Sequence, residues 1–122
     1  MIKETRLISD SLPGELTDTG RATTLALGER LRRLYVEQLK FMPAALENTD
    51  NMYLRATPIP RALDSVQQTF YGMYPPTARV PGFKNPIIVT RQASDETLFP
   101  NEGGCRRFAQ LSQVRCGASS SG

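Results

Sequence analysis

The chain has 122 residues, which is enough for one domain of ordinary size and too few for two. Its apolar fraction of 39% and mean hydropathy of −0.35 are typical of a soluble globular protein and argue against disorder of the whole chain. The net charge of +3 comes from 15 basic and 12 acidic residues dispersed along the chain, so no dense basic stripe indicates a nucleic-acid partner.

Residues 1–13 are polar and irregular, and we expect them to form an N-terminal segment outside the domain. They contain no continuous apolar stretch of the kind a secretory signal requires. No later segment approaches the ~20 apolar residues that a membrane helix needs. As written, the chain is therefore expected in the cytosol, with no membrane segment of its own.

A long amphipathic helix is predicted from about Asp18 to Phe41, ending before Pro43. Thr17 is the expected N-cap, because its hydroxyl can accept a hydrogen bond from a free amide of the first turn. The apolar residues at helical spacing are Leu27, Leu31, Leu34, Tyr35 and Met42. The arginines at 30, 32 and 33 alternate with glutamates, which favours a solvated face over a binding surface for an acidic partner.

A strand is expected to end at Met52–Leu54 and to lead directly into a second helix, from about Ile59 to Tyr71. Thr57 is a candidate N-cap, and Gly72 is the expected helix stop. The residues spaced for one buried helical face are Leu63, Val66, Phe70 and Met73.

Arg55 stands at the junction between this strand and this helix. A guanidinium at the carboxyl end of a strand, beside the positive end of a helix, can bind a phosphate or a carboxylate. From the residues alone an equally simple reading is that Arg55 pairs with a structural acid. Both readings stay open at this point.

A second strand is predicted at Pro86–Thr90, followed by a loop in which Asp95 and Glu96 are expected to be solvated rather than an acid/base pair. A turn at 101–104 and a short helix over 104–114 come next, and residues 117–122 form a flexible tail. The order helix, strand, helix, strand predicts an α/β fold with parallel strands.

The sequence lacks several kinds of catalytic group. It contains no histidine, so it can supply neither a histidine nucleophile nor a histidine metal ligand, and it contains no glycine-rich nucleotide loop. Cys105 and Cys116 match no metal spacing; they could bridge each other, pair outside the chain or stay reduced. We therefore predict no metal and no cofactor.

Four ordered blocks nevertheless resemble the histidine acid phosphatases. They are G-E-L-T-D-T-G-R-A-T-T-L-A-L-G-E-R-L-R-R-L-Y at 14–35, Y-L-R-A-T-P-I-P-R-A-L-D-S at 53–65, G-M-Y-P at 72–75 and S-D-E-T-L-F-P-N-E-G-G-C-R-R-F at 94–108. The last block is similar to the prostatic and lysophosphatidic-acid branches. The resemblance implies that residues 14–116 are part of a phosphoglycerate-mutase-like three-layer α/β sandwich, and that the chain is an internal fragment of a larger enzyme.

In that family a histidine in an R-H-G-x-R-x-P motif takes the phosphoryl group, and a distant H-D motif supplies the acid; neither motif is present here. By resemblance Arg55 matches the arginine that binds phosphate, and Arg61 and Thr57 match supporting positions, Arg61 more as an ion-pair partner than as a ligand. Ala56 replaces the usual serine. Cys105 matches a cysteine whose usual partner lies far toward the C-terminus, outside this chain.

The resemblance predicts a truncated phosphomonoesterase that is inactive alone, whose whole enzyme takes a phosphate or phosphomonoester. Family members are often secretory, lysosomal or membrane-associated, so the compartment of the parent stays open. The alternatives are a non-catalytic module that binds anions or a partner through the Arg55 corner, and a poorly packed α/β fragment without activity.

Overall fold

The computed structural model describes the backbone of residues 14–119 and the side chains of residues 14–114. The predicted irregular segment 1–13 lies outside the described residues. The elements in chain order are α1 (Asp18–Arg32), the π-helical turn η2 (Arg33–Gln38), β1 (Leu54–Arg55), α2 (Pro60–Met73), the 3-10 turn η3 (Pro76–Ala78), β2 (Ile88–Val89), the 3-10 turn η4 (Ala93–Asp95) and α3 (Arg106–Ser119). The chain therefore has the predicted α/β order of helix, strand, helix and strand.

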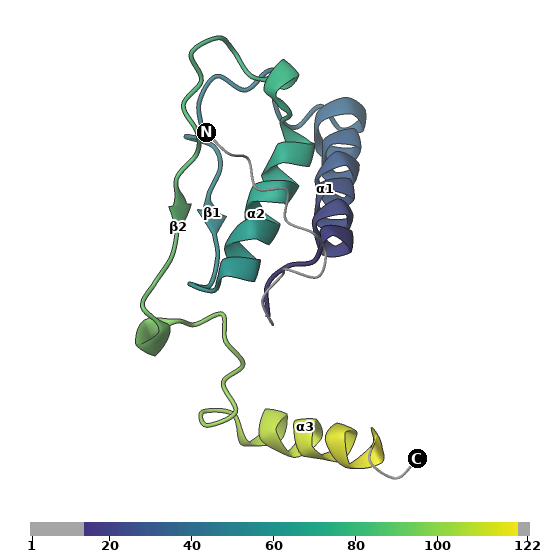
Figure 1. Ribbon diagram of the computed structural model, residues 1–122, viewed down its shortest axis with the longest axis vertical. Coiled ribbons are helices and arrows are strands. Elements are labelled where there is room, and N and C mark those ends of the chain that lie inside the picture. Colours follow the sequence, from purple (N-terminus) through teal and green to yellow (C-terminus); the bar gives the residue numbers. More distant parts are fainter. Residues whose placement is uncertain (1–13, 120–122) are drawn as a thin grey trace, which may run out of the picture.

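The two strands form a small parallel sheet; α2 lies next to β1, and α1 lies on the far side of α2 from the strands (Figure 1). Leu54 lies opposite Ile88 and Arg55 opposite Val89, and α2 makes the crossover. This confirms the predicted parallel pairing. The strands are shorter than expected, and Pro86, which has no amide hydrogen, removes a ladder donor at one end.

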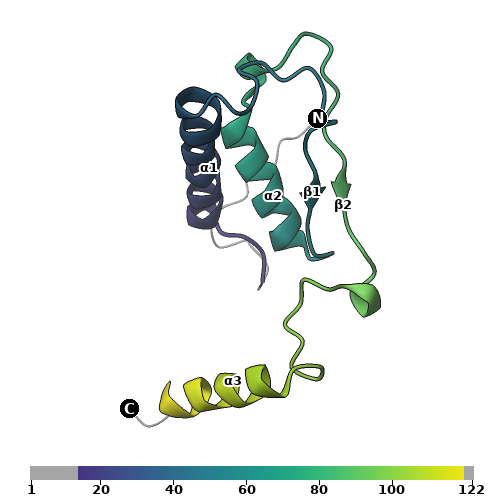
Figure 2. The same cartoon turned by 180° about the vertical axis from the view of Figure 1, so that it is seen from behind.

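The face of the sheet away from the helices is uncovered within the described residues. Tyr53 and Ile87 flank the paired positions and are 71% and 83% exposed. Figure 1 and Figure 2 show α1 and α2 on the β1 side of the sheet and no α-helix beyond β2. The strand that we expected to be buried is therefore only half-covered here, because burial on both faces needs a second helical layer.

Helices α1 and α2 cross closely at two glycines, Gly28 and Gly72. A Cβ atom on Gly28 would lie 2.0 Å from the Thr69 carbonyl oxygen, and one on Gly72 would lie 2.2 Å from the Leu25 carbonyl oxygen. The prediction that Gly72 stops the helix is therefore wrong. Gly72 is buried within α2, which continues to Met73, and it serves the contact between the helices.

This crossing also changes which residues of the first helix are buried. Leu27, Leu34 and Tyr35 are exposed, whereas Gly28 and Val36 are buried. Val36 belongs to a core cluster whose members are Val36, Leu46, Phe70, Met73, Tyr74 and Ala78. Phe70 and Met73 confirm the predicted inner face of α2. The predicted apolar face of the first helix was therefore only partly right. Leu31 and Met42 pack against this cluster, but the closest contact with α2 lies at Gly28, which carries no apolar signal.

The first helix ends earlier than predicted. After Arg32 the backbone widens into the π-helical turn, with the Leu39 amide donating to the Leu34 carbonyl at 2.9 Å. Lys40 then takes a positive φ of 51°, which no helix tolerates, so the chain leaves the helical path before Phe41.

Arg32 is not on a solvated face, contrary to our expectation. Its guanidinium donates to the Met73 carbonyl at 3.0 Å and the Ala44 carbonyl at 3.1 Å, and it lies over the Tyr74 ring. The Met73 carbonyl is one of the unpaired groups at the end of α2. Arg32 thus fixes the end of α2 against α1, whereas Arg30 and Arg33 are exposed as expected.

The second helix begins without the predicted threonine cap. Ile59 is the N-cap residue, with extended φ and ψ of −111° and 132° and no side-chain cap, and Pro60 is the first helical residue. A residue before proline is held extended, and a proline at the first position needs no amide partner. The Thr57 cap prediction is therefore wrong, because Pro58 and Pro60 set the helix start themselves.

The third helix begins after the predicted turn, where Gly104 donates to the Asn101 side chain at 2.8 Å. It runs from Arg106 to Ser119, three residues into the segment expected as a tail, and residues 120–122 lie outside the described ones. One interior glycine costs a helix only ~1 kcal/mol, so Gly117 does not stop it.

Cys105 is free and exposed, and the side chain of Cys116 is not among those described. Within residues 14–119 no helix is both long enough and apolar enough to cross a bilayer.

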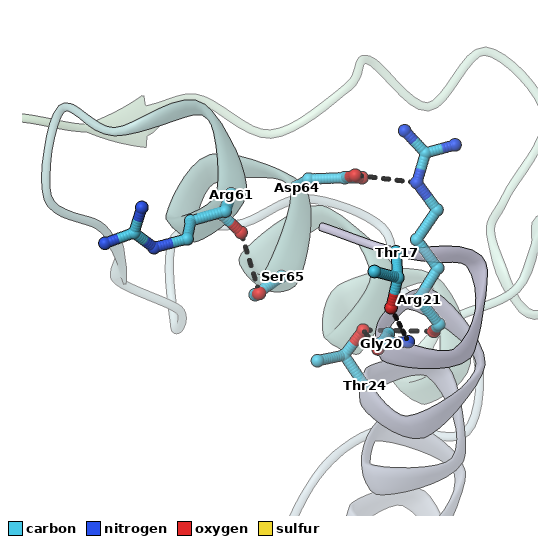
Figure 3. Close-up of polar contacts among 7 residues, drawn as sticks. All are labelled: Thr17, Gly20, Arg21, Thr24, Arg61, Asp64 and Ser65. Atoms are coloured by element: carbon cyan, nitrogen blue, oxygen red, sulfur yellow. Dashed lines mark hydrogen bonds and ion pairs between the residues drawn. The ribbon is translucent and has the colours of Figure 1, made fainter. Parts of the chain in front are cut away.

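Removing the N-cap of α1 is the first test of this fold. The Thr17 hydroxyl accepts a hydrogen bond from the Gly20 amide at 3.0 Å (Figure 3), which confirms the predicted cap. We expect Thr17→Ala to lower the free energy of unfolding by ~1 kcal/mol, measured by urea titration with circular dichroism at 222 nm. Thr17→Ser keeps the acceptor and should restore most of the loss; equal stability of all three chains would contradict the assignment.

Candidate functional site

Arg55 is the last residue of β1, and α2 begins five residues later at Pro60. The ladder continues one step beyond the strand, where the Ala56 amide donates to the Val89 carbonyl at 3.1 Å. The backbone that carries Arg55 is therefore fixed on both sides. The structure places Arg55 where the sequence predicted it, at the carboxyl edge of a parallel sheet next to a helix start.

The guanidinium of Arg55 forms a bidentate ion pair with Glu96, which lies just after η4. Nη1 donates to Oε2 at 2.9 Å and Nη2 donates to Oε1 at 2.6 Å. The Glu96 side chain is 0% exposed and that of Arg55 only 13%. The expectation that Glu96 is a solvated loop carboxylate is therefore wrong, whereas Asp95 beside it is exposed as expected.

Sequence reasoning missed Glu96 as a partner of Arg55 because 41 residues separate the two. A signal was nevertheless available. Neighbouring parallel strands end at the same edge of a sheet, so the loop after β2 must start close to the end of β1. An acid a few residues beyond β2 was therefore the natural candidate for the structural acid that we had considered for Arg55.

The ion pair determines the charge state of both groups. The Arg55 guanidinium is the main reason that the pKa of Glu96 falls from an ordinary 4.5 to about 2, and the Leu98 amide, which donates to Oε1 at 2.8 Å, lowers it further. The same hydrogen-bonded pairing raises the pKa of Arg55. Both side chains are therefore ionised at neutral pH, and the guanidinium is held by a full negative charge.

The two supporting candidates lie nearby on different surfaces. Thr57 is partly buried between β1 and α2. Arg61 is exposed, and its Nη1 donates to the Gly14 carbonyl at 3.2 Å. Figure 3 shows that Arg61 and Asp64 project from α2 in different directions; Asp64 instead pairs with Arg21 of α1 at 2.8 Å. Arg61 thus contacts a backbone carbonyl, and the ion pair on this part of α2 belongs to Asp64.

The described residues offer no obvious place for a metal. No group of three His, Cys, Asp or Glu side chains within them is arranged as metal ligands would be. The Arg55 guanidinium is an oriented cation, which can bind an oxyanion and stabilise negative charge that develops on it.

Comparison with known proteins shows which family has a segment similar to the one that carries Arg55 and Glu96. Residues 9–121 match the family model of the histidine phosphatase superfamily, branch 2. The chain is 54% identical over 98 residues to a probable acid phosphatase of Schizosaccharomyces pombe, covering 80% of this chain and 21% of that protein. It is 34% identical over 113 residues to human lysophosphatidic acid phosphatase type 6, covering 92% of this chain and 25% of that protein.

A third relative is counting factor 60 of Dictyostelium discoideum, which is 33% identical over 102 residues. That match covers 80% of this chain and 24% of the relative. The chain therefore spans about a quarter of the length of the curated relatives it matches. The matched part includes both strands, the α1–α2 pair and the Arg55–Glu96 ion pair.

Proposed function

Because the chain belongs to branch 2 of the histidine phosphatase superfamily, we propose that the whole protein hydrolyses phosphomonoesters and that Arg55 binds the transferred phosphoryl group. The observation that carries the proposal is the place of Arg55. It ends a parallel strand at the edge where ligands of α/β proteins bind, and its guanidinium already holds an oxyanion, the carboxylate of Glu96.

An arginine at this position can do more than bind substrate. Negative charge on the transferring oxygens changes as the bond to the leaving alcohol breaks, and a fixed guanidinium lowers the barrier if it fits the charge of the transition state. Arg55 is fixed in this sense, because its backbone is in the ladder and its side chain is in an ion pair. Thr57 and Arg61 are proposed to support the corner from the loop and from α2.

We further propose that this chain alone does not turn over substrate. It contains no histidine, so it cannot form the phosphohistidine intermediate that the family resemblance implies. In this proposal the chain is a truncated member that keeps one phosphate-binding arginine. The purified chain should release no phosphate from p-nitrophenyl phosphate above a buffer blank, and release that depends on Arg55 would contradict this.

The test of the binding site is a titration of the purified chain with inorganic phosphate and with vanadate. One arginine and a helix start should give at best millimolar binding, about −4 kcal/mol. Arg55→Ala should weaken it about tenfold or more, while Arg30→Ala, which removes an exposed arginine on α1, should leave it unchanged. Equal losses in both variants would show that only net charge matters, and the proposed site would fail.

A non-catalytic anion-binding module is the second candidate, favoured by an intact Arg55 corner in a chain without histidine. This second candidate requires that the chain bind phosphate with micromolar affinity and that Arg55→Ala abolish the binding. Micromolar affinity is far tighter than we expect from the truncated enzyme. Because one relative is named a lysophosphatidic acid phosphatase, lysophosphatidic acid belongs among the phosphomonoesters tested as ligands.

A further inference from the structure

The hydrogen-bond donors of Arg55 are divided between two edges of its guanidinium. A guanidinium carries five N–H groups in one plane. Both Nη1 hydrogens are used, for the Ala56 carbonyl and for Glu96 Oε2, each at 2.9 Å, and one Nη2 hydrogen is used for Glu96 Oε1. Among the residues that the structure describes, none accepts from Nε–H or from the second Nη2–H.

These two remaining N–H groups lie side by side along one edge of the guanidinium and point in the same direction. Such a fork matches two oxygens of a phosphate, just as the opposite edge matches the two oxygens of a carboxylate. The contact with Glu96 therefore leaves Arg55 with a complete bidentate site. The two readings of Arg55 from the sequence, a structural ion pair and a phosphate ligand, are compatible with each other.

We propose that Glu96 is a positioning residue: it holds the Nη1–Nη2 edge of Arg55 so that the Nε–Nη2 edge is presented to the phosphoryl oxygens. Glu96 and the phosphoryl group then occupy Arg55 at the same time, and neither displaces the other. This inference rests on the proposed function, because it takes Arg55 as a phosphoryl ligand.

The surroundings of Glu96 fit a positioning role. Its side chain is fully covered, and its Oε1 also accepts from the Leu98 amide at 2.8 Å. Arg55 Nη1 also donates to the carbonyl of Ala56, a residue that is only 3% exposed, so the guanidinium has a third fixed acceptor besides the two oxygens of Glu96. The arginine has therefore lost its rotamer freedom before any ligand arrives, so binding no longer has to supply that ordering entropy.

A competing arrangement makes an opposite prediction. If Glu96 instead occupies the place of the phosphate, phosphate must expel it, and the Glu96 carboxylate must leave Arg55 as the ligand binds. The two arrangements differ in which edge of Arg55 responds to phosphate and in whether Glu96 responds at all. Both responses can be followed by titrating the unsubstituted chain, and site variants are needed only to assign the signals.

The experiment is an NMR titration of the chain, labelled with ¹⁵N-arginine and ¹³C-glutamate, with inorganic phosphate at pH 7. Arg55→Lys and Glu96→Gln spectra assign the two signals. We expect the Arg55 Nε–Hε signal to move with phosphate while the Glu96 carboxyl carbon stays in place. If the Glu96 carbon moves along the same curve, phosphate displaces Glu96, and the inference fails while Arg55 remains a phosphate ligand. If no Arg55 signal moves with tens of millimolar phosphate, the proposed function of Arg55 fails as well.

A matched pair of variants separates positioning from charge. Glu96→Gln and Asp95→Asn each remove one negative charge from the same loop, but only Glu96 touches Arg55. An amide has one accepting oxygen, so Glu96→Gln cannot hold both Nη groups. We expect the dissociation constant for phosphate to be at least about threefold higher in Glu96→Gln than in Asp95→Asn, which is the effect of losing one hydrogen bond that positions Arg55. Equal or tighter binding by Glu96→Gln would overturn the inference. Glu96→Asp keeps the carboxylate and should fall between the two, and dispersed amide spectra of each variant verify that it is folded.

Discussion

Gly28→Ala is expected to destabilise the chain by about 3 kcal/mol, the upper end of the usual range for overpacking. The new Cβ would lie 2.0 Å from the Thr69 carbonyl oxygen and 2.9 Å from its carbon, and both belong to backbone that cannot rotate away. Helix propensity predicts the opposite sign, because alanine in a helix interior is favoured over glycine by ~1 kcal/mol. The sign of the change in the free energy of unfolding therefore tests whether α1 and α2 cross as closely as the structure shows.

The measurement is a urea titration followed at 222 nm, and a glycine in the same helix serves as the control. A Cβ on Gly20 would meet the end of the Leu16 side chain at 2.7 Å, and that side chain can move. Gly20→Ala should therefore stay within about 0.5 kcal/mol of the wild type. A Gly28→Ala chain as stable as the wild type would contradict the close crossing.

The partner glycine sharpens the same prediction. A Cβ on Gly72 would lie 2.2 Å from the Leu25 carbonyl oxygen and 3.1 Å from the Gly28 Cα. Gly28→Ala and Gly72→Ala therefore both introduce a clash at the same contact between the helices. Once the first alanine has pushed the helices apart, the second has more room. We therefore expect the double variant to lose clearly less stability than the sum of the two single losses.

The parts of the fold that the sequence predicted correctly depend on local chemistry. The Thr17 cap involves residues three apart, and the parallel pairing of β1 with β2 follows from the crossover through α2. The inner face of α2 shows in the spacing of Phe70 and Met73. The cap and the inner helix face depend on side chains whose preference is visible within one turn, and the pairing depends only on the order of the elements along the chain.

The parts that could not be predicted depend on contacts between distant segments. Gly72 reads as a helix stop because its lack of a side chain is a local signal, whereas its use against Gly28 depends on how two helices cross. Arg32 reads as a solvated residue because the carbonyl of Met73, its acceptor, is 41 positions away. Glu96 reads as a loop carboxylate for the same reason, although the topology could have placed it near Arg55.

For the candidate site, the sequence therefore supplied the cation and its position but not its partner. Arg55 was identified by its place at a strand end and by its match to a family block. The Glu96 contact determines which edge of Arg55 is available, and this information exists only in three dimensions. Because Arg55 is the partner of a buried carboxylate, the stability of the chain should depend on pH.

We expect the chain to lose stability steeply below pH 5, with Glu96 as a main cause. The pKa of Glu96 is about 2 in the folded chain, against an ordinary 4.5. Between these values the unfolded chain takes up a proton at Glu96 and the folded chain does not, so added protons favour unfolding. The stabilisation by the ion pair is complete above pH 4.5 and disappears as the pH falls toward 2.

Glu96→Gln isolates this contribution. The variant should be less stable than the wild type at pH 7, because Arg55 is then mostly covered and has lost its charged partner. Its stability should fall less steeply between pH 5 and pH 3, so the two urea midpoints should converge as the pH is lowered. Asp95→Asn, which removes an exposed carboxylate one residue away, should keep the wild-type slope. Parallel curves for the wild type and Glu96→Gln would show that the carboxylate of Glu96 is not held by Arg55 in solution.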